Sequence, residues 1–126
     1  GMTALLWAAF HDDMKLAEQL VAAGANGKAT NRYGVSPLSL ACRNGNGAMV
    51  KLLLEKGADP NTKLNGGETA LMTASRTGRI EAVKALLDKG ADVNAKEQRG
   101  QTAMMWATAE GHADVVDVLM SQAELS

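Results

Sequence analysis

Apolar residues in this chain recur with helical spacing inside short segments, and the segments themselves recur every 33 residues. Between residues 48 and 56 the apolar side chains are Met49, Val50, Leu53 and Leu54, which form one stripe along a helix. Two apolar columns extend this pattern along the chain: Leu20, Leu53, Leu86 and Leu119, and Ala17, Val50, Val83 and Val116. A fixed period of this length is typical of a solenoid, whose units are too small to bury an apolar face alone.

Polar and small residues set the limits of the helices inside one unit. Ser36 is expected to cap a short first helix over residues 37–43, because its hydroxyl can accept from the first free amides and Pro is favoured at the first helical position. The Asn- and Gly-rich residues 44–47 break this helix, and a second helix is expected over residues 48–56. Gly57 then ends it in a left-handed conformation, and an extended arm leads to the next turn.

The whole chain is expected to form one domain, residues 1–126, with repeats at residues 1–33, 34–66, 67–99 and 100–126. Residues at the helix-capping position share the interval of 33 and are Thr3, Ser36, Thr69 and Thr102. A column of small residues follows the same interval at Ala8, Ala41, Ala74 and Ala107. This column predicts that neighbouring first helices approach each other closely. Small inner helices beside bulkier outer ones are expected to curve the stack, with the first helices lining its concave side.

Two motifs give the chain a family resemblance. The first is T-P-L-H-x-A, which appears here as residues 3–8 (TALLWA), 36–41 (SPLSLA), 69–74 (TALMTA) and 102–107 (TAMMWA). The second, Gly-Ala-Asp-Val-Asn-Ala, is intact at residues 90–95. The chain therefore resembles the ankyrin-repeat family. The resemblance implies an all-α ankyrin-repeat solenoid of four 33-residue helix-turn-helix repeats joined by hairpin arms.

The chain departs from the family pattern at two positions of the repeat. The motif His, which in the family ties neighbouring turns together, is replaced by Leu6, Ser39, Met72 and Met105. We expect less rigid hairpin tips, with apolar contacts of Leu6, Met72 and Met105 as a substitute. Asp12 stands where the later repeats have Gly45, Gly78 and Gly111, so the first inter-helix turn is expected to differ.

Composition excludes several classes of function. Aromatic residues make up 3% of the chain, so the core is expected to consist of Ala, Leu, Val and Met, with little room for a large ligand. The net charge of −1 argues against binding to nucleic acid or an anionic membrane. No apolar run reaches the ~18 residues that a membrane span needs, and no signal peptide is visible. Cys42, the one cysteine, excludes an internal disulfide and favours a reducing, cytoplasmic compartment.

No constellation of residues suggests catalysis. His11 and His112 are three units apart and cannot share a metal ion or a proton relay. His112 follows a glycine as in the family, which implies a local hydrogen-bonding role. Cys42 is expected to be a small, semi-buried residue, and Asp12 and Asp13 to begin a helix. We therefore predict a protein that is not an enzyme, with no catalytic residues, no metal site and no cofactor.

Side chains that the stack does not need remain at the turn tips and on the exposed side of the first helices. In a solenoid of this kind these positions form one continuous concave strip, where we expect a partner protein or peptide to bind. The expected partner-binding residues are Arg32, Tyr33, Arg43, Asn44, Asn65, Glu68, Arg76, Thr77, Arg99 and Gln101.

The expected strip is rich in arginine. Four of the five lie on it, and Arg43 and Arg76 occupy the same column in adjacent units. Arg makes forked contacts to carboxylates and is enriched at interface hot spots, so one hypothesis is an acidic partner held along Arg32, Tyr33, Arg43 and Arg76. The alternative is that the arginines are solvated and pair with neighbouring glutamates, Glu68 or Glu110.

The tryptophans and the first repeat leave further alternatives open. Trp7 and Trp106 are expected to pack partly between neighbouring first helices, or else to serve as half-exposed anchors for a partner. Met2, Leu6 and Phe10 have no preceding unit to cover them, which predicts either a missing upstream repeat or self-association through the N-terminal repeat. The predicted function is a protein–protein interaction module. The alternative is a structural or regulatory segment that docks on a neighbouring domain of a larger protein.

Overall fold

The computed structural model describes residues 3–28 and 30–125, with the side chains described as far as residue 122. Eight α-helices follow one another in these residues: α1 (Ala4–Phe10), α2 (Met14–Ala22), α3 (Pro37–Asn44), α4 (Gly47–Glu55), α5 (Ala70–Arg76), α6 (Ile80–Asp88), α7 (Ala103–Ala109) and α8 (Ala113–Leu125). Within the same residues the β-type pairing is an isolated bridge between Lys63 and Thr69. The predicted all-α stack of helix pairs is confirmed. The division of the chain into four repeats stays a prediction.

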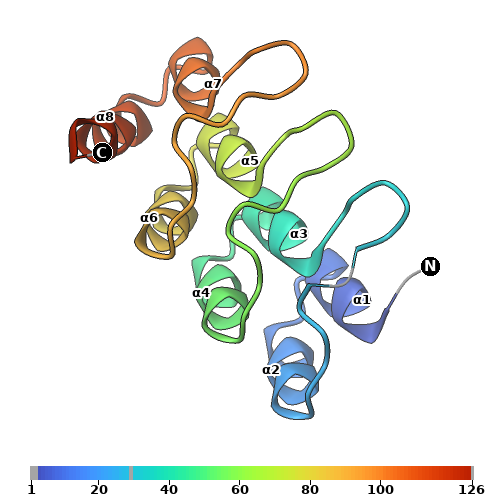
Figure 1. Cartoon of the computed structure of the whole chain (residues 1–126). Coiled ribbons are helices and arrows are strands. Elements are labelled where there is room, and N and C mark those ends of the chain that lie inside the picture. Colours follow the sequence, from blue (N-terminus) through green and yellow to red (C-terminus); the bar gives the residue numbers. More distant parts are fainter. Residues whose placement is uncertain (1–2, 29, 126) are drawn as a thin grey trace.

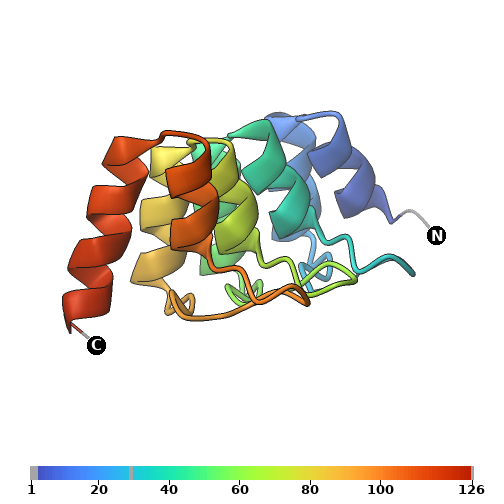
Figure 2. The same ribbon diagram turned by 90° about the horizontal axis from the view of Figure 1, so that it is seen from above.

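The helices form two rows, shown in Figure 1. We call α1, α3, α5 and α7 the inner helices and the others the outer helices. Each inner helix packs on the next inner helix and on its own outer helix. Three arms, described over residues 24–28 with 30–35, 57–68 and 90–101, leave the same end of the helices and extend beyond the inner row (Figures 1 and 2). We call the surface made by the inner helices and the arm tips the inner face.

Capping residues start the inner helices where the sequence predicts. The hydroxyl oxygens of Thr3, Ser36, Thr69 and Thr102 each accept from the backbone N–H three residues later. Ser39 completes a reciprocal cap, since its hydroxyl accepts from the Ser36 N–H at 3.0 Å. Asp13 caps α2 by accepting from the Leu16 N–H, as expected of a helix start. The outer helix α4 begins at Gly47, one residue before its predicted start.

The small-residue column lies at the centre of the stack. Ala8, Ala41, Ala74 and Ala107 are all 0% exposed, which agrees with a close approach of neighbouring inner helices. The outer-helix column is buried in the middle of the stack, with Leu53 at 1% and Leu86 at 0%, while Leu20 in α2 is only half-buried. Leu119 in the last helix pair is 1% exposed, so the weaker burial in this column is confined to the first pair.

Two expectations for the first helix pair are wrong. Asp12 has a backbone φ of 55°, close to the 76° of Gly45, so the first inter-helix turn keeps the left-handed conformation of the later ones. Asp is among the few non-glycine residues that tolerate this conformation. Leu6 is 1% exposed, so it is not an uncovered residue at the end of the stack. Met2 lies outside the described residues.

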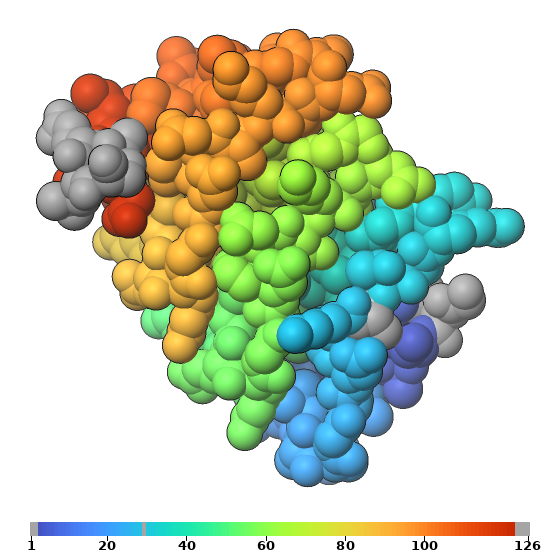
Figure 3. Space-filling view, in the orientation of Figure 1, coloured from blue at the N-terminus to red at the C-terminus, as the bar shows by residue number. Residues whose placement is uncertain are grey.

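Hydrogen bonds tie the arms together although the motif His is missing. The backbone N–H of Asn65 donates to the Tyr33 carbonyl at 3.1 Å, and that of Gln98 donates to the Gly66 carbonyl at 2.8 Å. Successive arm tips are therefore joined through the backbone, and the space-filling view shows the arms side by side (Figure 3). Leu6 and Met72 are buried as expected of substitutes for the His. Met105 is 53% exposed, so that part of the expectation is wrong.

Candidate partner-binding face

Two of the predicted arginines lie together on the inner face. Arg43 comes from α3 and Arg76 from α5, and both border a small hollow of about 80 Å³ between these helices and the second arm. Val35, Leu40 and Leu64 contribute apolar surface to it. The arrangement follows from the repeat, because residues 33 apart occupy equivalent positions on neighbouring inner helices.

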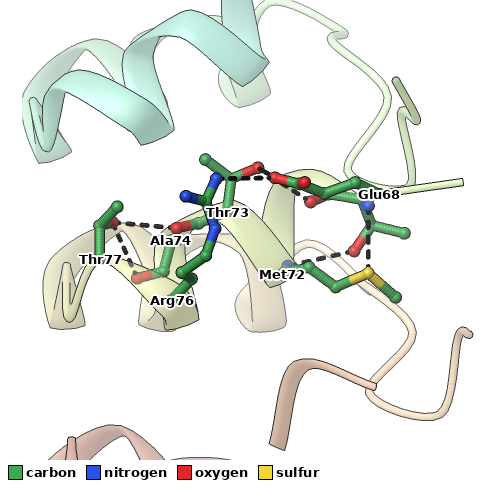
Figure 4. Close-up of polar contacts among 7 residues, drawn as sticks. Glu68, Met72, Thr73, Ala74, Arg76 and Thr77 are labelled. Atoms are coloured by element: carbon green, nitrogen blue, oxygen red, sulfur yellow. Dashed lines mark hydrogen bonds and ion pairs between the residues drawn. The ribbon is translucent and has the colours of Figure 1, made fainter. Parts of the chain in front are cut away.

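Arg76 is held by a carboxylate of its own chain (Figure 4). Its Nη2 atom lies 3.1 Å from Oε2 of Glu68, and the Thr73 hydroxyl donates to the same oxygen at 2.6 Å. The pair is partly exposed, with side-chain exposures of 37% for Arg76 and 24% for Glu68. The sequence left open that the arginines pair with neighbouring glutamates of the same chain. Arg76 does so, because it is paired with Glu68.

The C-terminal part of the inner face is built around Trp106. The guanidinium carbons of Arg76 and Arg99 lie 5.5 and 5.7 Å from the centre of the indole. Arg99 is also paired, since its Nε atom lies 3.2 Å from Oε2 of Glu97. Both arginines here have a carboxylate partner and an aromatic neighbour, and Trp106 is half-buried beneath them.

The N-terminal part of the inner face differs in charge and exposure. The guanidinium carbon of Arg43 lies 5.9 Å from the centre of the Phe10 ring, and that of Arg32 lies 5.3 Å from the Tyr33 ring. In the described part of the chain neither arginine is within ion-pair distance of a carboxylate. Phe10 and Tyr33 are 49% and 59% exposed, and Trp7 is 46% exposed, which matches the half-exposed alternative for this tryptophan.

Four of the predicted site residues make hydrogen bonds within the scaffold, and two of these bonds join neighbouring repeats. The Asn44 side-chain amide donates to the Ala9 carbonyl at 2.8 Å, and that of Asn65 donates to the Arg32 carbonyl at 3.1 Å. The Thr77 hydroxyl donates to the Thr73 carbonyl at 2.9 Å, one turn back in α5. The backbone N–H of Gln101 donates to Glu97. The ten predicted residues thus do not form one uniform strip.

Glu97 is the residue of this face that the sequence analysis missed. It is 9% exposed, and its Oε1 accepts from the backbone N–H groups of Arg99 at 2.7 Å and Gln101 at 3.0 Å. The hydrogen bond from Gln101 is the largest cause that lowers the pKa of this carboxyl from its ordinary 4.5, and the contacts with Arg99 add to it. Asn31, two repeats earlier, accepts from Tyr33 and Val35 in the same way. The sequence signal for this turn was a side chain with an acceptor oxygen at both equivalent positions, Asn31 and Glu97.

Residues that could support other chemistry are not assembled in the described part of the chain. No three His, Cys, Asp or Glu side chains there come close enough to hold a metal ion. Burial raises the pKa of the Cys42 thiol to about 12, so the thiolate required of a nucleophile is not formed at neutral pH. Cys42 is 0% exposed and is therefore fully buried rather than semi-buried. None of the helices in the described residues has the length and apolarity to cross a bilayer.

Comparison with known proteins agrees with the helical stack. A family model described as ankyrin repeats (3 copies) matches residues 1–64 and residues 60–126. Among curated proteins, a palmitoyltransferase named AKR1 from Lachancea kluyveri is 42% identical over 59 residues, which are 47% of this chain and 8% of that protein. The chain thus aligns with only a small part of a much longer relative. Because the family model matches this chain from residue 1 to residue 126, the chain belongs to the ankyrin-repeat family.

Proposed function

We propose that this chain is a recognition module that binds a partner protein or peptide on its inner face and carries out no catalysis itself. Ankyrin repeats indicate a protein–protein interaction module. The inner face is chosen because most of the exposed large apolar side chains lie there. Trp7, Phe10 and Met105 are on inner helices and Tyr33 is on an arm tip, whereas Met120 alone of this set is on an outer helix. Exposed aromatic residues beside arginines are typical of interface hot spots.

The partner that fits this face is acidic. Arg32, Arg43, Arg76 and Arg99 all reach the inner face, and two of them have no carboxylate partner in the described residues. Because the arms are joined to each other by hydrogen bonds, the face is organised before the partner arrives, which reduces the ordering entropy lost on binding.

Capture from a native extract tests this proposal. The inner-face variant is Arg43→Gln with Arg76→Gln, and Gln is chosen because Glu at position 76 would face Glu68. The matched control is Lys51→Gln with Lys84→Gln, which removes the same charge from exposed positions on the outer helices α4 and α6. We expect the wild type and the control to capture the same proteins and the inner-face variant to lose them. Equal capture by both variants would reject the inner face as the binding surface.

A second candidate is a regulatory segment that binds a neighbouring domain of its own protein. The observation in its favour is the relative named a palmitoyltransferase, in which the similar residues are only 8% of the protein. If the natural gene product is longer, hydrogen exchange of that product should show α1 and α3 more protected than in the isolated chain. Equal protection of the two helices in both forms would argue against docking in cis.

Self-association through the N-terminal repeat is also testable. Trp7 and Phe10 on α1 are each about half exposed, and they are the described apolar residues that could support it. Sedimentation of the wild type and of Phe10→Ser at several concentrations measures it. A concentration-dependent dimer that Phe10→Ser disrupts is the expected sign, and a wild-type monomer at every concentration rules it out.

A further inference from the structure

We infer that the partner is gripped mainly by the N-terminal part of the inner face, where Arg43 binds a carboxylate that lies next to an apolar side chain of the partner. This inference rests on the proposed function and names the chemistry of the same face. We call the surface formed by Trp7, Phe10, Arg32, Tyr33 and Arg43 the N-terminal patch.

Charge distinguishes the two parts of the inner face. In the C-terminal part, Arg76 and Arg99 already have carboxylate partners at 3.1 and 3.2 Å. A ligand carboxylate has to compete there with Glu68 or Glu97. In the N-terminal patch Arg32 and Arg43 have no such partner among the described residues, so their charge is available to a ligand. Charge complementarity therefore favours an acidic group at this patch.

The contact between Arg43 and Phe10 prepares the guanidinium for a carboxylate. The guanidinium carbon lies 5.9 Å from the centre of the ring, within the range of a cation–π interaction. The attraction acts on the charge of the guanidinium and requires none of its N–H groups as a hydrogen-bond donor. These N–H groups can donate in parallel to the two oxygens of a carboxylate.

An apolar site adjoins the same arginine. The hollow of about 80 Å³ bordered by Arg43 has apolar walls from Val35, Leu40 and Leu64, and its polar side is formed by Ser39, Thr73 and the Glu68–Arg76 pair. A single water needs about 10–15 Å³ of such a hollow, which therefore has room for several waters or roughly one aliphatic side chain. A partner segment that places a Leu, Ile, Val or Met beside an Asp or Glu satisfies both neighbouring features. This is the occupant that the geometry points to.

Exposed aromatic surface provides the rest of the contact. Trp7, Phe10 and Tyr33 are 46%, 49% and 59% exposed, and all three belong to α1 or to the tip of the first arm. His11 extends this surface, because its ring centre is 4.1 Å from that of Trp7 and 5.1 Å from that of Phe10. Phe10 borders the charged contact at Arg43, and a partly exposed aromatic group beside such a contact excludes water from it on binding, which strengthens it.

Selection from a random peptide library, about 12 residues long and displayed on phage, tests the inference. The library is selected separately against the wild type, Arg43→Gln, Arg43→Glu, Arg99→Gln and the outer-face control Lys51→Gln. Thermal unfolding of each variant establishes that it is folded. Affinities of individual wild-type binders are then measured by fluorescence anisotropy.

We expect the wild-type binders to be enriched in Asp or Glu within two positions of an aliphatic residue. Arg43→Gln should weaken these peptides at least about tenfold, and Arg43→Glu should select Lys or Arg in place of the acid. Arg99→Gln, in the C-terminal part and outside the hollow, and Lys51→Gln should change the same affinities less than about threefold.

Several results overturn the inference. These are a library that yields no binder, binders without acidic enrichment, and an effect of Arg99→Gln as large as that of Arg43→Gln. A wild-type chain that dimerises through Arg43 overturns it as well, because the occupant is then a second copy. Binders that depend on Arg99 but not on Arg43 reject only this inference. Binders that depend on Lys51 reject the inner face and with it the proposed function.

Discussion

His112 connects two helix pairs, because its Nε2 atom lies 3.0 Å from the backbone carbonyl oxygen of Arg76, 36 residues earlier. The predicted hydrogen-bonding role of this residue is confirmed, but the contact joins α8 to the end of α5 rather than being local. The imidazole also covers Gly78, where a Cβ atom would lie 2.8 Å from the ring. The equivalent residue one repeat earlier, Arg79, covers Gly45 in the same manner.

This relationship predicts that His112→Ala lowers the stability of the chain. The Arg76 carbonyl loses its partner and Gly78 loses its cover, and the expected cost is about 1 kcal/mol, or a fall in Tm of about 3–5 °C. Thermal unfolding by circular dichroism measures the change. His11→Ala is the matched control, because His11 is exposed and makes no hydrogen bond through its ring in the described structure. A similar Tm for His112→Ala and the wild type would show that the contact contributes nothing to stability.

The first two arms lack a connection that the second and third arms have. The Oδ1 atom of Asn61 accepts from the Asp92 N–H at 2.8 Å, and its amide donates to the Gly90 carbonyl at 3.4 Å. Lys28 occupies the equivalent position of the first arm, and a hollow of about 360 Å³ lies there between the arms. The backbone is already in place, since the Lys28 N–H is bonded to Asn26 as the Asn61 N–H is bonded to Asp59.

Lys28→Asn should therefore stabilise the chain. The new side chain would face the Gly57 carbonyl and the Asp59 N–H, one repeat before the groups that Asn61 binds. The expected gain is about 0.5–1.5 kcal/mol, measured by chemical denaturation. The reverse change, Asn61→Lys, is expected to cost a similar amount. A loss of stability in Lys28→Asn would mean that the first two arms are not related as the second and third are.

Close approach of the inner helices predicts that Ala74→Leu is unfavourable. Ala74 is 0% exposed in α5, and three additional carbon atoms have no space there. Overpacking should cost roughly 1–3 kcal/mol of unfolding free energy, measured by urea denaturation. Ala48→Leu makes the same change at an exposed position of α4 and should be nearly neutral. If the two variants were equally stable, the inner helices would have to be further apart than described.

The hydrogen bonds of Glu97 predict that the free energy of unfolding depends on pH. Its pKa is lowered in the folded chain, chiefly by the hydrogen bond from the Gln101 backbone. Because the folded pKa is below the unfolded one, the carboxylate stabilises the fold above the unfolded pKa, and this contribution is lost as the pH falls through the folded pKa. Glu97→Gln should thus be less stable than the wild type at pH 7, and the difference should shrink below a pH of about 4.5.

Thermal unfolding between neutral pH and about pH 3 measures this difference. Glu55→Gln, which removes one negative charge from an exposed position of α4, controls for the change in net charge and should give a much smaller difference at pH 7. A difference between Glu97→Gln and the wild type that stayed constant over the whole range would contradict a role for the ionised carboxylate.

Much of the fold could be predicted because its signals act over short distances in the chain. Ser36 caps a helix whose N–H groups are three residues away, and Gly57 ends one at a positive φ of 97°. The expected difference at Asp12 was wrong because the backbone of a turn follows the packing of the helices on both sides, and an aspartate can adopt the conformation that glycine usually provides.

The candidate site was predicted only in outline. The sequence placed Arg43 and Arg76 in one column, but it could not show that Arg76 is held by Glu68 while Arg43 lies near the Phe10 ring. Asn44 and Thr77 were expected to face a partner and instead bond to backbone carbonyls of the scaffold. Such choices depend on which acceptors lie within about 3 Å once the helices have packed.

The sequence by itself determined where the helices begin and which small residues meet between them, because caps and close contacts require particular residue types at a regular spacing. Only the tertiary structure decided which arginines remain available to a partner. Glu68 is on an arm, Arg76 is on α5 and Trp106 is on α7, and their distances depend on how the arms fold back beside the inner helices. Two arginines of the same repeat column therefore have different surroundings: Arg76 has a carboxylate partner, and Arg43 has none among the described residues.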